Sequence, residues 1–150
     1  MGKRREGREA AMQFLFQRDL NSSDFPELLE TFPVLRPLKP AVQQFCTKLV
    51  TGVAEHQSKI DERIQKYTTN YELRRIAAVD RNVLRLAIYE MLYTHDVPPV
   101  VIINEAIEIA KRFGSDESGR FVNGILDRIR GELNRPARTP DFPPSPRPDA

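Results

Sequence analysis

Apolar residues recur at helical spacing along most of the chain. In the clearest case Val42, Cys46, Leu49, Val50 and Val53 fall three or four positions apart, which is typical of one buried helix face. No segment keeps the period-two alternation of a half-buried strand over several residues. The pattern predicts helices over 5–20, 26–32, 40–67, 71–76 and 79–93, followed by two more within 98–129.

The stretch 96–127 carries the strongest start and stop signals. Pro98-Pro99 favours a helix start, because proline has no N–H to give to an interior turn. Gly114 is expected to end that helix in the left-handed conformation. Ser115 or Asp116 then caps the last helix, and its apolar stripe is Val122, Ile125, Leu126 and Ile129.

These elements define an all-α fold. Short connections between amphipathic helices indicate neighbours that pack antiparallel or at moderate angles. We therefore expect a compact bundle of about seven helices in two small helical subdomains, with a shared core and no sheet.

Composition limits the class of protein. The chain has 150 residues, 40% of them hydrophobic and 29% charged, which suits one globular domain with a real core. It has no apolar run long enough for a membrane span, and its one cysteine excludes an internal disulfide. We therefore expect a cytoplasmic protein without a membrane partner.

The net charge of +2 is concentrated at the two ends of the chain. Residues 1–9 hold four cations against two carboxylates, and the proline-rich segment 134–150 holds three against two. That segment has almost no apolar residue, so it is expected to be a disordered tail. The predicted organisation is a basic arm over 1–9, a helical domain over 10–133 and the tail over 134–150.

The first helix contains a geometric conflict. Arg4, Arg5 and Arg8 project onto the same half of the helical wheel as the apolar residues that begin at Ala11. Unpaired arginines cannot enter an apolar core, because each buried charge costs several kcal/mol. The core is therefore expected to stop near Ala11. The residues before it either overhang the body as a helical extension or leave the helix, and in both cases they form a mobile basic arm suited to phosphate groups or serving only for solubility.

A second basic element precedes the stripe of the last helix. Arg120 and Phe121 place a cation beside an aromatic ring at a helix entrance. Single-stranded RNA is held by cations on its backbone and by rings that stack on its bases. Phe121 is also suited to the edge of the core.

Three motifs resemble the NusB family of transcription antitermination factors. They are RREGREAAMQFLF at 4–16, VDRNVLRLAIYEML at 79–92 and DVPPVVIINEAIEIAKRFGSDESGRFVNGILD at 96–127. The resemblance implies binding to the single-stranded boxA element of ribosomal RNA leader transcripts. It also implies a heterodimer with a small-subunit ribosomal protein that acts as NusE, and indirect association with other antitermination factors and RNA polymerase.

The resemblance also implies where the RNA binds. With the basic Lys3 of the arm, the RNA-binding residues that we predict are Lys3, Arg4, Arg5, Arg8, Gln13, Glu117, Arg120 and Phe121. Exposed polar positions on the helix 79–93 are the candidates for the protein-partner surface, namely Asp80, Arg81 and Glu90.

The alternative classes have less support. His56, His95 and Cys46 share no motif, and the chain has no Gly-rich phosphate loop or metal-ligand spacing, so we predict no catalytic residue, metal or cofactor. A DNA-binding helix-turn-helix would need a run of base-reading side chains after Arg120, and apolar residues follow instead. A homodimer that covers the partner surface remains a third alternative.

Overall fold

The computed structural model describes residues 2–22, 24–68 and 72–133, and within these ranges it contains helices and turns but no strand. The predicted all-helical fold is confirmed. The described residues form six α-helices and one short 3₁₀ turn, where about seven helices were predicted. The tail predicted over 134–150 lies outside the described residues. The elements are α1 (Lys3–Asn21), α2 (Phe25–Leu35), α3 (Pro40–Lys66), a short 3₁₀ turn η1 (Leu73–Arg75), α4 (Ala78–Tyr93), α5 (Pro99–Phe113) and α6 (Asp116–Glu132).

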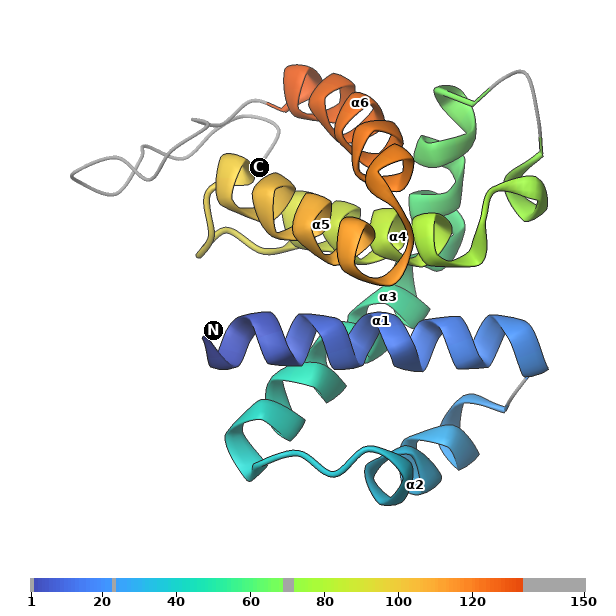
Figure 1. Cartoon of the computed structure of the whole chain (residues 1–150), viewed down its shortest axis with the longest axis vertical. Coiled ribbons are helices and arrows are strands. Elements are labelled where there is room, and N and C mark those ends of the chain that lie inside the picture. The colour runs from blue at the N-terminus through green and yellow to red at the C-terminus, as the bar shows by residue number, and fades with distance from the viewer. Residues whose placement is uncertain (1, 23, 69–71, 134–150) are drawn as a thin grey trace.

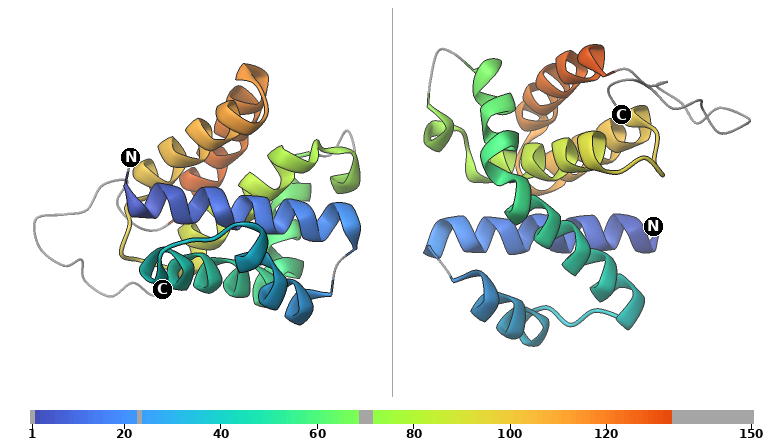
Figure 2. Two further views of the ribbon diagram at one scale, coloured as in Figure 1. Left: turned by 60° about the horizontal axis from the view of Figure 1, so that its bottom comes forward. Right: turned by 180° about the vertical axis from the view of Figure 1, so that it is seen from behind.

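Helix α4 lies at the centre of the molecule. It contacts α1 and α3 on one side and α5 and α6 on the other. Figure 1 shows α1 across the middle, with α2 and the start of α3 on one side and α4, α5 and α6 on the other. In the reverse view of Figure 2, α3 crosses α1 obliquely and continues toward the second group. The two helical groups that the sequence predicts are therefore joined by the long helix α3.

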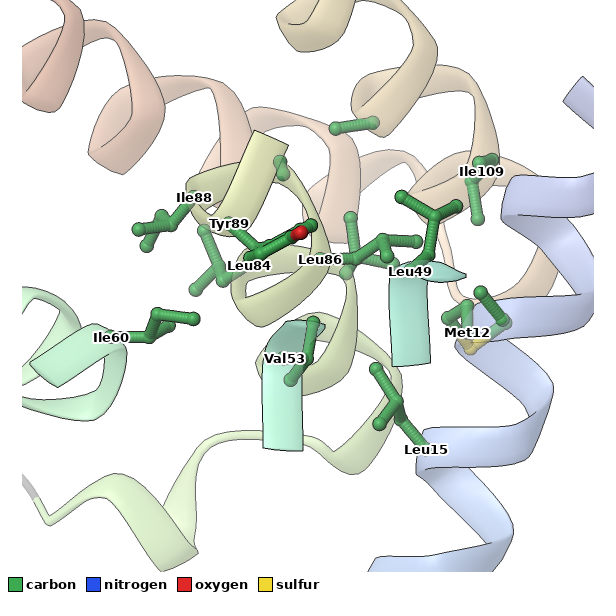
Figure 3. Close-up of a cluster of buried hydrophobic side chains, with 14 of the residues drawn as sticks. Met12, Leu15, Leu49, Val53, Ile60, Leu84, Leu86, Ile88, Tyr89 and Ile109 are labelled. Atoms are coloured by element: carbon green, nitrogen blue, oxygen red, sulfur yellow. The ribbon is translucent and has the colours of Figure 1, made fainter. Parts of the chain in front are cut away.

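One hydrophobic core runs through both groups. Figure 3 shows Met12 and Leu15 of α1 facing Leu49 and Val53 of α3, while the side chains of α4 fill the centre. Every residue from Asn82 to Met91 is buried. The polar residues in this part of α4 therefore do not form a solvent-exposed face. The predicted stripe of α6 is also buried, at Val122, Ile125, Leu126 and Ile129.

The end of α2 differs from the prediction. Pro33 was expected to lie in a loop, yet α2 continues through it to Leu35. The preceding Phe32 is 4% exposed and packs edge-on against Phe14, with ring centroids 5.3 Å apart. Packing of Phe32 therefore extends the helix by a final turn in spite of the proline.

The turn between α5 and α6 also differs in detail. Gly114 has φ −117°, so the expected left-handed conformation is wrong. A Cβ at this position would lie 2.5 Å from Ser118 Oγ and 2.8 Å from the carbonyl oxygen of Ala110. Glycine is needed here because the two helices approach closely, and Ser115 then caps α6 by accepting a hydrogen bond from Ser118 N at 3.2 Å.

Candidate nucleic-acid interface

The arginines at the start of α1 have different surroundings. Arg8 is buried and donates from Nε and Nη2 to both carboxylate oxygens of Glu90, at 2.7 and 2.9 Å. The side chains of the two residues are only 5% and 3% exposed. A bidentate pair of this kind satisfies both charges inside the protein, so Arg8 is not available to a phosphate group in this structure.

Arg5 is intermediate between buried and exposed. Its guanidinium binds Glu105 in the middle of α5, with an Nε to Oε1 distance of 2.6 Å. The hydrogen bond from Arg5 holds the pKa of Glu105 below its ordinary value, against the opposing effect of burial. Glu105 also lies 3.7 Å from Arg8 Nη1, so one carboxylate ties two turns of α1 to α5.

Lys3 and Arg4 are the exposed cations of this element. The side chain of Arg4 is 55% exposed, and its contact with Asp96 is a long 3.4 Å between exposed groups. Its guanidinium lies 4.9 Å from the ring centroid of Phe45 on α3. An exposed pair of this geometry contributes little to stability and exchanges readily for another anion.

The prediction of a mobile arm that ends at the core near Ala11 is therefore wrong. Residues 3–9 form the first turns of α1, and Gly7, Arg8 and Glu9 are already buried. The conflict on the helical wheel is resolved because Glu90 and Glu105 supply the counter-charges that the prediction assumed to be missing.

The start of α6 has a different character. Glu117 and Arg120 are exposed, while Phe121 is half-buried and packs against the core. Glu117 and Phe121 line a shallow hollow of about 510 Å³ together with Arg75, Ile76 and Ser115. A cation from the segment before α4 thus shares a concave surface with an aromatic ring and a carboxylate.

The predicted partner residues are less exposed than expected. Glu90 is buried with Arg8, and Asp80 is 8% exposed. The side chain of Arg81 is 13% exposed and donates to Asp19 Oδ2 at 2.9 Å. Its Nη1 also donates to the carbonyl oxygens of Leu73, Arg74 and Ile76. The expectation that these positions are exposed is wrong. Glu90 joins α4 to α1 and Arg81 joins α4 to α1 and η1, whereas Asp80 is buried with its Oδ1 unpaired.

A second concave surface lies along α1. It is a groove of about 470 Å³ lined mostly by apolar side chains, together with Gln13, Gln17 and Asn21. Gln13 Oε1 accepts a hydrogen bond from Arg36 Nε, which brings a cation from the segment after α2 onto this face. Leu20, which also lines the groove, is 67% exposed. The main lining residues are Met12, Phe16, Leu20, Val79 and Phe113.

Two charged residues that contact α1, Glu105 and Arg112, were not predicted from the sequence. Glu105 gave no signal, because its role depends on a contact with Arg5 across the fold. Arg112 did give one, since the dipeptide Arg-Phe occurs at 112–113 as well as at 120–121. Arg112 binds Glu9 of α1 at 2.7 Å and lies 5.2 Å from the ring centroid of Phe113.

The described residues contain no cluster of three or more His, Cys, Asp or Glu side chains that could hold a metal ion. Cys46 is buried, and burial raises the pKa of its thiol to about 11, which keeps it protonated at neutral pH. None of the helices described here is both long and apolar enough to span a membrane.

Together these features define an all-helical protein with cations at the entrances of two helices. Residues 5–130 match the family model described as the NusB family, so the chain belongs to the NusB family. The predicted family is therefore confirmed. The chain is 48% identical to transcription antitermination protein NusB of Sorangium cellulosum, over 90% of this chain and 96% of that relative. It is 47% identical to the Bacillus subtilis protein of the same name, over 89% and 98% of the two chains.

Solved structures agree with this assignment. T. maritima NusB superposes with a TM-score of 0.78 at 41% identity, over 86% of this chain and 91% of that one. A crystal structure of antitermination factors NusB and NusE in complex with dsRNA contains a chain with a TM-score of 0.81 at 26% identity, over 89% and 99%. The fold described above is thus the fold of NusB proteins.

Proposed function

We propose that this protein suppresses transcription termination by binding the boxA element of nascent ribosomal RNA transcripts together with a small-subunit ribosomal protein that acts as NusE. The observation that carries this proposal is the likeness, over nearly the whole chain, to a structure in which NusB, NusE and RNA occur together. Other antitermination factors and RNA polymerase then join indirectly. The proposed role is non-catalytic and cytoplasmic, in support of ribosomal RNA synthesis.

The RNA surface that we propose is smaller than the predicted residue set. Lys3 and Arg4 at the start of α1 and Arg120 at the start of α6 are exposed and contact phosphate groups. Phe121 stacks on a base, and Glu117 in the same hollow accepts a hydrogen bond from a base amino group. Arg5 and Arg8 support this surface from inside, through Glu105 and Glu90.

The ribosomal partner binds the groove along α1 in this proposal. Its apolar lining and the exposed Leu20 offer the kind of surface that a protein partner buries. Val79 lines this groove and Asp80 lines the neighbouring hollow, so the start of α4 lies between the proposed protein and RNA surfaces. Asp80 and Arg81 then affect partner binding by positioning this segment, and Gln13 lies where the partner and the RNA approach each other.

A binding titration tests the proposal. Labelled single-stranded boxA RNA is titrated with the full chain plus the ribosomal partner, between low and moderate salt. Three phosphate contacts by Lys3, Arg4 and Arg120 predict a slope of log K against log salt of about −2 or steeper. Arg120→Ala and Phe121→Leu are expected to weaken binding, while Lys59→Ala, which changes an exposed cation on α3, serves as the matched control.

Three results would contradict the proposal. One is a slope near zero, and another is equal binding of boxA RNA and an RNA of scrambled sequence. The third is a stable homodimer that excludes the ribosomal partner, measured by light scattering. Duplex RNA and duplex DNA of the same sequence are included as competitors, because the related complex contains dsRNA.

A further inference from the structure

The end of α5 lies between the two basic elements of the proposed RNA surface. On one side Arg112 Nη1 binds Glu9 Oε2 on α1 at 2.7 Å. On the other side the stem of Lys111 packs over α6, since a Cβ at Gly119 would lie 2.7 Å from Lys111 Cγ. Gly119 is the neighbour of Arg120 in the chain. Figure 1 shows the end of α5, where it turns into α6, lying close to α1.

The ion pair of Arg112 differs from that of Arg8 in one respect. In the Arg8 pair both side chains are buried, whereas in the Arg112 pair the side chain of Glu9 is 5% exposed and that of Arg112 is 56% exposed. The buried carboxylate fixes the position of the cation through one nitrogen. Because more than half of the Arg112 side chain is exposed, an anion from solution can reach its remaining guanidinium donors.

Phe113 adds a second support for this cation. The guanidinium carbon of Arg112 lies 5.2 Å from the centroid of the Phe113 ring, which also lines the groove along α1. A planar guanidinium held by a ring and a carboxylate is ordered before any ligand arrives. Binding an anion then costs less side-chain entropy than it would for a free surface arginine.

Lys111 is the weaker member of the pair. Its ammonium lies 3.6 Å from Glu108, one helical turn earlier, and both groups are about half exposed. This contact offsets part of its charge. Arg112 is therefore expected to contribute more to anion binding than Lys111 does.

We propose that Arg112, assisted by Lys111, is a further phosphate-binding site that carries the RNA backbone from the start of α1 to the start of α6. This inference rests on the proposed function, because it assumes that one RNA strand contacts both basic elements. The phosphate accepts hydrogen bonds from the outward guanidinium nitrogens while Glu9 keeps its contact from below. Arg112, the one arginine of α5, then links Arg4 and Arg120.

The test uses the full chain with its ribosomal partner and a single-stranded boxA RNA oligonucleotide. Arg112→Gln alone would leave the buried Glu9 without its counter-charge, so the main variant is Arg112→Gln combined with Glu9→Gln. This variant is expected to make the salt slope shallower by about 0.7 and to weaken binding several-fold at low salt. Lys111→Gln, which leaves Glu9 untouched, is expected to shift the slope in the same direction by less.

A matched control separates the possible failures. Lys59→Gln is expected to leave the slope unchanged, because it removes no proposed phosphate contact. If wild type binds and both the Arg112→Gln/Glu9→Gln and Lys111→Gln variants keep its slope, only this inference is overturned. If wild type with its partner does not bind the RNA, the proposed function fails as well.

Discussion

Arg8 in α1 and Arg120 in α6 both lie near the start of a helix, yet their surroundings are opposite. Arg8 is enclosed between α4 and α5, where two carboxylates neutralise it. Arg120 is exposed at the entrance of α6, beside the hollow that contains Phe121. The same side chain therefore holds helices together in one place and is available to a ligand in the other. Which role an arginine takes depends on the carboxylates that the fold brings to it.

The largest expected effect is on the stability of the buried pair. Arg8→Ala leaves Glu90 buried without its counter-charge, so the free energy of unfolding should fall by about 3–5 kcal/mol. Denaturant unfolding measures this loss. The double variant Arg8→Met/Glu90→Leu removes both charges and is expected to recover most of it. If Arg8→Ala costs no more than Arg120→Ala, the contrast between the two arginines is wrong.

A matched pair of glycines probes the packing at the same two helices. A Cβ at Gly7 would lie 2.5 Å from Phe45 Cδ2, whereas a Cβ at Gly124 in α6 would meet nothing within 4 Å. Gly7→Ala should therefore destabilise the protein by about 1–3 kcal/mol through overpacking. Gly124→Ala should stabilise it by up to about 1 kcal/mol, because alanine favours the helix. Equal effects in thermal unfolding would mean that α1 is not held against Phe45.

Acid is expected to weaken the ion pairs that join α1 to α4 and α5. Arg5 lowers the pKa of Glu105 below its ordinary 4.5. Burial opposes the same shift at Asp19, but Arg85 and Arg81 outweigh it and lower that pKa below 3.8. Because a depressed carboxyl pKa stabilises the folded state only while the group is ionised, this stability is complete above these ordinary values and is lost as the pH falls through the folded-state pKa.

Unfolding measured at successive pH values from 7 to 3 tests this expectation. Glu105→Gln should lower stability at pH 7 and flatten the acidic decline, since it removes one of the two responsible groups. A steeper decline in the variant would contradict the assignment.

The smallest expected effect concerns the exposed ion pair of Arg4. Arg4→Gln should change the free energy of unfolding by less than about 1 kcal/mol, because its contact with Asp96 is long and exposed. The same variant should still weaken RNA binding. A large loss of stability in Arg4→Gln would contradict this, because it would mean that Arg4 holds helices together as Arg8 does.

Local sequence signals predicted most of the fold. The stripes of α3 and α6, the start of α5 at Pro99 and the cap at Ser115 depend on neighbouring residues and were found. Pro33 was misplaced because the burial of Phe32 against Phe14 overrides a local helix breaker. The course of α4 was predicted, but the burial of its polar side chains was not, since four helices cover it.

The candidate site was harder to predict for the same reason. The exposure of Arg120 follows from its place on the polar side of an amphipathic helix. The burial of Arg8 depends on Glu90, whose contact spans 82 positions of the chain. A single sequence contains no signal for such a pair, so the helical wheel correctly identified the conflict but not its resolution.

The salt dependence of boxA RNA binding tests the central contrast most directly. The Arg8→Met/Glu90→Leu variant, confirmed as folded, and the Arg120→Gln variant are compared with wild type in the presence of the ribosomal partner. We expect the first to keep the wild-type slope of log K against log salt, and the second to make it shallower by about 0.7. A shallower slope for the Arg8 variant together with an unchanged slope for Arg120→Gln would contradict this account.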